Sequence, residues 1–141
     1  MGDTGRLYAI DISPRFVEYV EQRAEDQELL NVIAVRNDDQ SLMLQRNKVD
    51  RVLLCDSYHC FVQPENMLRS IFASLQPGGE VVLVETSRKP GISSEEVLET
   101  VRADRATFRN ELTQAGLEFI EEATPSGMTS HYVLRFRRPI R

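Results

Sequence analysis

Residues 67–85, MLRSIFASLQPGGEVVLVE, decide the fold of this chain. Apolar residues recur at helical spacing in the first half and predict a helix with one buried face: Met67, Leu68, Ile71, Phe72 and Leu75. Gln76-Pro77-Gly78-Gly79 predicts a stop, because proline cannot continue a helix and glycine tolerates a sharp turn. The run in Glu80–Glu85 predicts a strand that is apolar on both faces. Such a strand is typical of the buried middle of a mainly parallel sheet.

Three short apolar runs upstream predict further strands, namely Leu7–Ile10, Asn31–Val35 and Val49–Cys55. A helix is predicted between the first two, because Ser13 can cap it and Pro14 suits its first turn. Its apolar face would consist of Phe16, Val17, Val20 and Ala24. Strands that alternate with helices indicate an α/β sheet.

The chain after Glu85 predicts one more helical region and a strand pair. Ser93 and Glu96 have capping-box spacing, and a discontinuous apolar face follows them until Gly116. Leu117–Glu121 and His131–Phe136 predict an antiparallel pair at a sheet edge, because apolar and polar residues alternate in the second run. We therefore expect one domain that spans residues 1–141.

Composition narrows the classes of function. A net charge of −5 disfavours binding to nucleic acid or to anionic membranes. The sequence shows neither a candidate membrane span nor a signal peptide, so we expect a cytoplasmic protein. Cys55 and Cys60 lack the spacing of a metal site or a disulfide framework, and we expect small core residues and no bound metal. The arginines near the C-terminus are expected to keep a sheet edge soluble: Arg135, Arg137, Arg138 and Arg141.

The order of these motifs resembles the class I S-adenosylmethionine-dependent methyltransferases from their second strand to their end. The matching motifs are LYAIDIS, NVIAVRNDDQSL, VDRVLLCDSYHCF and the LQPGG turn with its valine-rich strand. The resemblance implies a Rossmann-like, mainly parallel sheet with an antiparallel C-terminal strand pair. It also implies S-adenosylmethionine as the cofactor and a small molecule as the methyl acceptor.

The resemblance also assigns site residues. Asp11 corresponds to the acid that accepts the ribose hydroxyls of the cofactor, and a carboxylate has two oxygens suited to a vicinal diol. Further cofactor contacts would come from Ile12, Asn37, Asp38, Asp39 and Cys55. The acceptor would lie beside Tyr58 and His59, and His59 could act as a general base.

One family element has no counterpart in this sequence: the first, central strand with its glycine-rich loop. That strand would lie between the strands that hold Asp11 and Val52, so its absence predicts two free strand edges. One hypothesis is a misread start, with about 40 further residues upstream, by the usual size of a βα unit. The other is a short chain that closes its sheet by direct pairing or by exchange in a homodimer.

Two other functions remain open at the level of sequence. The chain could be a non-catalytic remnant that acts as a dimer or as a partner subunit, and the missing glycine loop favours this reading. It could also be a Rossmann-type nucleotide-binding protein, because an acid after the second strand suits a ribose there too. The LQPGG turn and the terminal strand pair argue against that second alternative.

Overall fold

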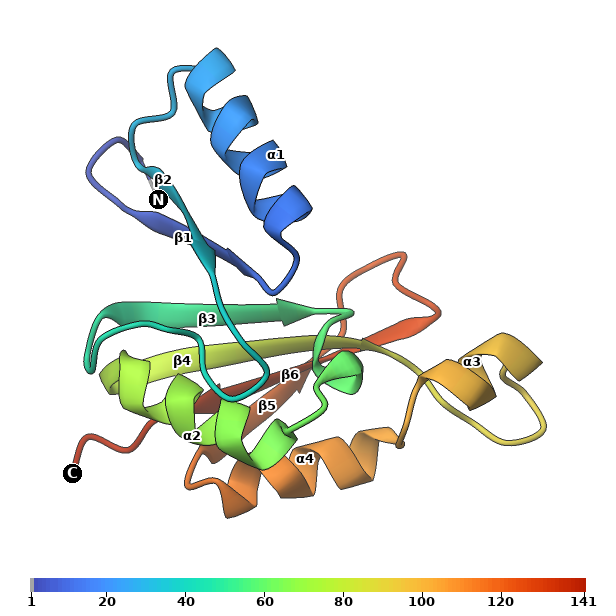
Figure 1. Cartoon of the computed structure of the whole chain (residues 1–141). Helices are drawn as coiled ribbons and strands as arrows, with labels where there is room; N and C mark the ends of the chain where they lie inside the picture. The colour runs from blue at the N-terminus through green and yellow to red at the C-terminus, as the bar shows by residue number, and fades with distance from the viewer. Residues whose placement is uncertain (1) are drawn as a thin grey trace.

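The structure, a computed structural model that describes residues 2–141, contains two β-sheets (Figure 1). The first sheet pairs two strands in parallel and is accompanied by one helix: β1 (Leu7–Asp11), α1 (Pro14–Asp26) and β2 (Val32–Arg36). The remaining elements build the second unit: β3 (Val49–Cys55), the short 3₁₀ helix η1 (Tyr58–Cys60), α2 (Pro64–Ser74), β4 (Leu75–Thr86), α3 (Glu95–Thr100), α4 (Arg105–Gln114), β5 (Glu118–Ala123) and β6 (His131–Arg137).

The second sheet has the strand order β3-β4-β6-β5. Strand β3 runs parallel to β4, whereas β6 is antiparallel to both β4 and β5. The predicted α/β class with an antiparallel C-terminal pair is therefore confirmed. Within residues 2–141, no helix has the length and apolarity needed to cross a bilayer.

Within residues 2–141, the two sheets are not hydrogen-bonded to each other. Among the described residues, β1 pairs only with β2, and β3 pairs only with β4, so each has one free edge. Figure 1 shows the two units one above the other, with separate sheets. The expectation of two free edges is confirmed, and the idea that the chain closes its sheet by direct pairing is wrong.

The core lies on one face of the four-stranded sheet, where α2 and α4 cover it (Figure 1). Register places Leu54, Leu83 and Leu134 side by side across three strands. These residues are buried against apolar side chains from the two helices: Met67, Leu68, Ile71, Phe108 and Leu112. By contrast, α1 has no buried residue, and Phe16 of its predicted apolar face is exposed, because no element of the described chain covers it.

Strand β4 begins earlier than the sequence predicts, at Leu75 instead of Glu80. Leu75 pairs with Val49, and a register shift follows before Arg51 pairs with Glu80. Inside this irregular strand, Gly78 keeps the positive φ that is typical of a turn, at 81°. Its N–H donates to the Arg138 carbonyl. The LQPGG segment is thus paired and bulged rather than free.

The predicted helical region after Glu85 is two helices, α3 and α4. Each starts at a side-chain cap: Ser94 accepts from the Val97 N–H, and Asp104 accepts from the Thr107 N–H. Ser93, which the capping-box spacing favoured, instead bonds to the backbone of the preceding loop. Gly116 ends the region as predicted, with a φ of 98°.

Other expectations need correction. Cys55 and Cys60 are exposed, not core residues, because both lie where the chain leaves β3 and η1 at the surface. Ser13 occupies the N-cap position of α1 but its side chain makes no capping hydrogen bond. The C-terminal arginines do more than solubilise an edge: Arg135 pairs with Glu80, and Arg138 donates to the Phe72 carbonyl at the end of α2.

We expect Leu134→Ala to lower the free energy of unfolding by about 2–5 kcal/mol, as is usual for a buried leucine truncated in a packed core. Leu134 is 1% exposed between β4 and β5, whereas Leu30 is 96% exposed. The matched substitution Leu30→Ala should change stability by less than about 0.5 kcal/mol. Urea denaturation of both variants measures the difference, and equal effects would contradict the assigned core.

Candidate functional site

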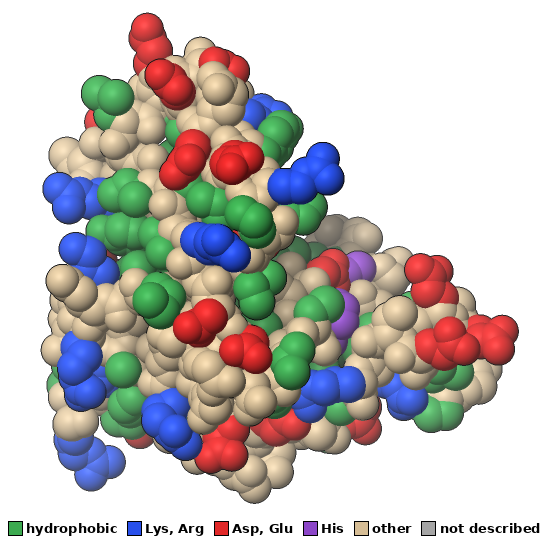
Figure 2. Space-filling model, viewed as in Figure 1, with side chains coloured by type: hydrophobic (Ala, Val, Ile, Leu, Met, Phe, Trp, Pro, Cys, Tyr) green, Lys and Arg blue, Asp and Glu red, His purple; other side chains and the backbone are tan. Residues whose placement is uncertain are grey.

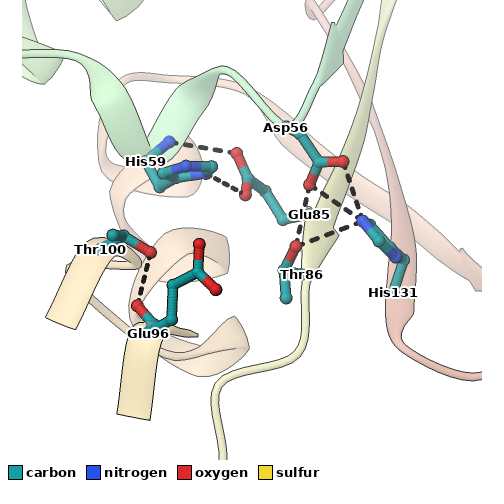
Figure 3. Close-up of polar contacts among 7 residues, drawn as sticks. All are labelled: Asp56, His59, Glu85, Thr86, Glu96, Thr100 and His131. Carbon is teal, nitrogen blue, oxygen red and sulfur yellow. Dashed lines mark hydrogen bonds and ion pairs between the residues drawn. The ribbon is translucent and has the colours of Figure 1, made fainter. Parts of the chain in front are cut away.

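Polar side chains gather where β3 and β4 end, at the carboxyl edge of their parallel pair. Asp56 directly follows β3 with a φ of 46°, and its N–H donates to the Val84 carbonyl. Glu85 lies near the end of β4, and His59 belongs to η1. The parallel pairing of the two strands brings these three residues to one place (Figure 3).

Glu85 holds His59 with both of its carboxylate oxygens. The His59 backbone N–H donates to Oε1 at 3.1 Å, and the ring Nδ1 lies 2.7 Å from Oε2. Glu85 is fully buried, so its orientation is fixed. Since a carboxylate accepts hydrogen bonds, this contact favours the tautomer with the proton on Nδ1. Nε2 of His59 is then left as a proton acceptor.

A second histidine–carboxylate pair lies beside the first (Figure 3). His131, the first residue of β6, places Nε2 at 3.0 and 2.8 Å from the two oxygens of Asp56. The Thr86 hydroxyl donates to Asp56 Oδ1 at 3.0 Å. The Asp56 carboxylate is thus oriented by two side chains from two different strands.

The two pairs form one cluster. Asp56, His59 and Glu85 each offer one oxygen or nitrogen atom, and these atoms lie within 4.8 Å of one another. Both histidines of the chain belong to the cluster. A buried acid that fixes an imidazole is an arrangement suited to general acid–base chemistry.

Tyr58 lies away from this cluster, in the core. Its side chain is fully buried, with its ring edge against Phe61 and Phe108. The hydroxyl donates to Glu111 Oε2 at 2.7 Å, and Arg102 holds both oxygens of the same carboxylate. Burial, and next the hydrogen bond to Glu111, raise the pKa of the Tyr58 phenol above its ordinary value. Its position indicates a structural role.

The residues expected to contact the cofactor lie at the carboxyl ends of β1, β2 and β3. Asp11 and Asn37 are neighbours there, because the Asn37 N–H donates to the Asp11 carbonyl at 3.2 Å. Ile12 is exposed beside Asp11, and Cys55 is exposed at the end of β3. Asp38 closes its own loop, since Oδ1 accepts from the N–H groups of Gln40 and Ser41. Asp39 contacts Gln40 in the same loop.

The Asp11 carboxylate has an oxygen that could accept a hydrogen bond from the ribose of a nucleoside. One oxygen accepts from the Ser13 N–H at 2.7 Å, while the structure gives the other oxygen no partner among residues 2–141. An exposed carboxylate with a free oxygen can accept from a ribose hydroxyl. Asp38 has a similar arrangement, because its Oδ1 holds two backbone N–H groups and the structure gives its Oδ2 no partner among residues 2–141.

Sequence reasoning missed three members of the cluster: Asp56, Glu85 and His131. Glu85 and Asp56 had a usable signal, because Glu85 ends the valine-rich run of β4, Asp56 follows β3, and the carboxyl ends of these parallel strands share an edge. His131 had none, since its place depends on the antiparallel return of β6.

Comparison with known proteins places this geometry in context. The model of a protein family, described as a methyltransferase domain, matches residues 1–83. Two curated relatives, the demethylmenaquinone methyltransferases of Geobacillus sp. (strain WCH70) and Oceanobacillus iheyensis, are each 25% identical over 88 residues, or 62% of this chain. The match spans 38% and 37% of the lengths of those relatives.

Solved structures agree with the fold over nearly the whole chain. The [4+2]-cyclase SpnF superposes with a TM-score of 0.85 at 16% identity, covering 97% of this chain and 67% of the cyclase. A SAM-dependent methyltransferase from Aquifex aeolicus gives a TM-score of 0.84 at 17% identity, with 96% and 70% covered. The two sheets of this chain therefore stand in the arrangement found in those larger chains.

We expect Tyr58→Phe to destabilise the fold without altering the cluster. The variant keeps the ring packing and loses a hydrogen bond to a charged group, which is worth about 1.5–3 kcal/mol. Thermal and urea unfolding measure the loss. An unchanged stability would contradict the assigned role of the hydroxyl in the core.

Proposed function

This chain belongs to the methyltransferase domain family, and we propose that it transfers a methyl group from S-adenosylmethionine to a small-molecule acceptor. The observation that carries the proposal is the His59–Glu85 pair at the carboxyl edge of the parallel strands. S-adenosylmethionine, when bound, supplies an activated methyl group on a sulfonium centre, so the protein's work is to bind, orient and manage a proton.

Asp11 is the proposed anchor of the cofactor. Its free carboxylate oxygen would accept from the ribose hydroxyls, and Ile12 and Asn37 lie beside it. Asp38 and Asp39 lie in the loop that follows β2, where the family resemblance puts the adenine. Cys55, at the end of β3, would border the methionine end.

His59 is the proposed general base. An acceptor hydroxyl, amine or acidic C–H would give its proton to Nε2, while Glu85 keeps the other ring nitrogen protonated. The imidazolium that forms is stabilised because the buried Glu85 carboxylate lies 2.7 Å from Nδ1. Tyr58 is left out of this set, since its buried hydroxyl bonds to Glu111.

The acceptor is proposed to be a small aromatic alcohol of the quinol class. The two curated relatives are named for action on demethylmenaquinone, and a quinol hydroxyl or ring C–H is a proton source suited to a histidine base. An open surface hollow of about 390 Å³ is lined by residues 125–131, which include His131 of the cluster. We also propose a cytoplasmic protein, and the net charge of −5 argues against nucleic acid and anionic membrane surfaces as partners.

The free edges of β1 and β3 support a further proposal, that one more parallel strand completes the sheet between them. A free edge leaves backbone N–H and C=O groups without partners. The strand could come from residues outside the given sequence or from a second copy in a homodimer. Without it, the same edges favour the alternative function, a non-catalytic subunit that docks on a partner.

We expect the 141-residue chain to bind S-adenosylmethionine and S-adenosylhomocysteine in a calorimetric titration. Asp11→Asn should weaken binding about tenfold or more, because it removes a charge-assisted hydrogen bond worth about 1.5–3 kcal/mol. Asp3→Asn is the matched control, since Asp3 precedes the amino end of the same strand and is exposed. Sedimentation of the same samples gives the oligomeric state.

Two outcomes contradict parts of this proposal. A cooperatively folded chain that binds neither compound would favour the non-catalytic subunit. A folded monomer that binds both would eliminate exchange between two copies as the source of the missing strand.

We expect His59→Gln to lower kcat by about 10²–10⁴-fold, the usual contribution of a general base. The assay follows transfer of a labelled methyl group from S-adenosylmethionine to demethylmenaquinol. Binding of the cofactor should not change, because His59 lies on η1 and Asp11 ends β1. Tyr58→Phe serves as the control and should keep its activity at a temperature where it is folded. Full activity in His59→Gln would show that His59 is not the general base.

A further inference from the structure

Beyond methyl transfer, the geometry points to a divalent transition-metal site of the zinc type formed by Asp56, His59 and Glu85. One atom of each residue lies within 4.8 Å of the atoms of the other two. Ligands bound to one zinc ion lie at about 2.0–2.2 Å from it, so pairs of ligand atoms are expected within about 4.4 Å of each other. His59 Nδ1 and Glu85 Oε2 are now 2.7 Å apart across a shared proton, so the metal would displace that proton and the two atoms would move apart slightly.

The three ligands come from three separate elements and differ in exposure. Glu85 is fully buried in β4, His59 is half-buried in η1, and Asp56 is exposed after β3. A metal held there would face solvent on the side of Asp56. Three protein ligands with an open fourth position are typical of zinc sites that bind water or an exchangeable molecule.

Both carboxylates are already oriented by hydrogen-bond donors. His59 contacts both oxygens of Glu85, Oε1 through its backbone N–H and Oε2 through Nδ1, while His131 and Thr86 hold Asp56. Each carboxylate oxygen has two lone pairs, so these donors leave room for a metal bond. Outer contacts of this kind fix the direction of the ligands in metal sites. They distinguish the cluster from a set of surface acids.

The chemistry of the ligands selects the ion. Imidazole suits zinc, cobalt, nickel and copper, whereas magnesium and calcium prefer oxygen ligands only. Two carboxylates also balance the charge of a divalent ion. We therefore expect Zn²⁺ and Co²⁺ to bind at this site in preference to Mg²⁺.

Metal binding would switch off the base, a consequence that rests on the proposed function. A metal shared with Glu85 must bind His59 through Nδ1, because that ring nitrogen faces the Glu85 carboxylate. The ring proton of the neutral imidazole then lies on Nε2, which can only donate. Zinc is therefore an inhibitor of a reaction that needs His59 as a base.

The test is a calorimetric titration of Zn²⁺, with Co²⁺ absorption as a second readout. Cys55 and Cys60 are exposed thiols beside the cluster in sequence, so a Cys55→Ser/Cys60→Ser protein provides the background. We expect one saturable site in that background and no comparable binding of Mg²⁺. Asp56→Asn and His59→Gln should each weaken zinc binding about tenfold or more. Asp26→Asn, an exposed acid on α1, is the matched control and should bind normally.

Three results would overturn the inference: no zinc binding by the folded cysteine-free protein, unchanged binding in Asp56→Asn or His59→Gln, or equal weakening in Asp26→Asn. A thermal melt of each variant confirms folding. Because calorimetry reads the metal directly, the site is judged apart from methyl transfer. If zinc fails to bind while His59→Gln still loses activity, the metal site falls and the proposed function stands.

Discussion

Strand β4 is the element on which this structure depends, because it is hydrogen-bonded on both sides, to β3 and to β6. Its residues alternate between two environments: Val81 and Leu83 face α2 and α4, and Glu85 continues the same buried row. The functional cluster is therefore an extension of the core. The burial that stabilises β4 also removes the freedom of the Glu85 carboxylate, whose two oxygens find their hydrogen-bond partners, within residues 2–141, on His59.

The fold could be predicted largely from local patterns. The valine-rich run of Glu80–Glu85 and the alternation in His131–Phe136 indicated a parallel strand and an antiparallel edge, and both are present. The ends of the helices and strands were harder to predict from the sequence, because they depend on tertiary partners. The extension of β4 back to Leu75 follows from its pairing with Val49, which turn residues alone do not reveal.

The site was predictable only in part. His59 was recognised from its place after β3, but its acid partner is 26 residues away and is fixed by strand pairing. Tyr58, its neighbour in sequence, points into the core instead, because adjacent residues of a short 3₁₀ helix face different directions. The exposure of Cys55 and Cys60 also escaped prediction, since small apolar side chains give no periodic signal over such short stretches.

The uneven distribution of buried side chains has a consequence for dynamics. No residue from 2 to 36 is fully buried, whereas the four-stranded unit holds the entire core. Opening of the β1–α1–β2 unit therefore costs less free energy than global unfolding, and its amides should exchange with solvent sooner. Asp11 belongs to this looser unit and His59 to the tighter one. A nucleoside held by Asp11 would rigidify the first unit, so ligand affinity and local order would be thermodynamically linked.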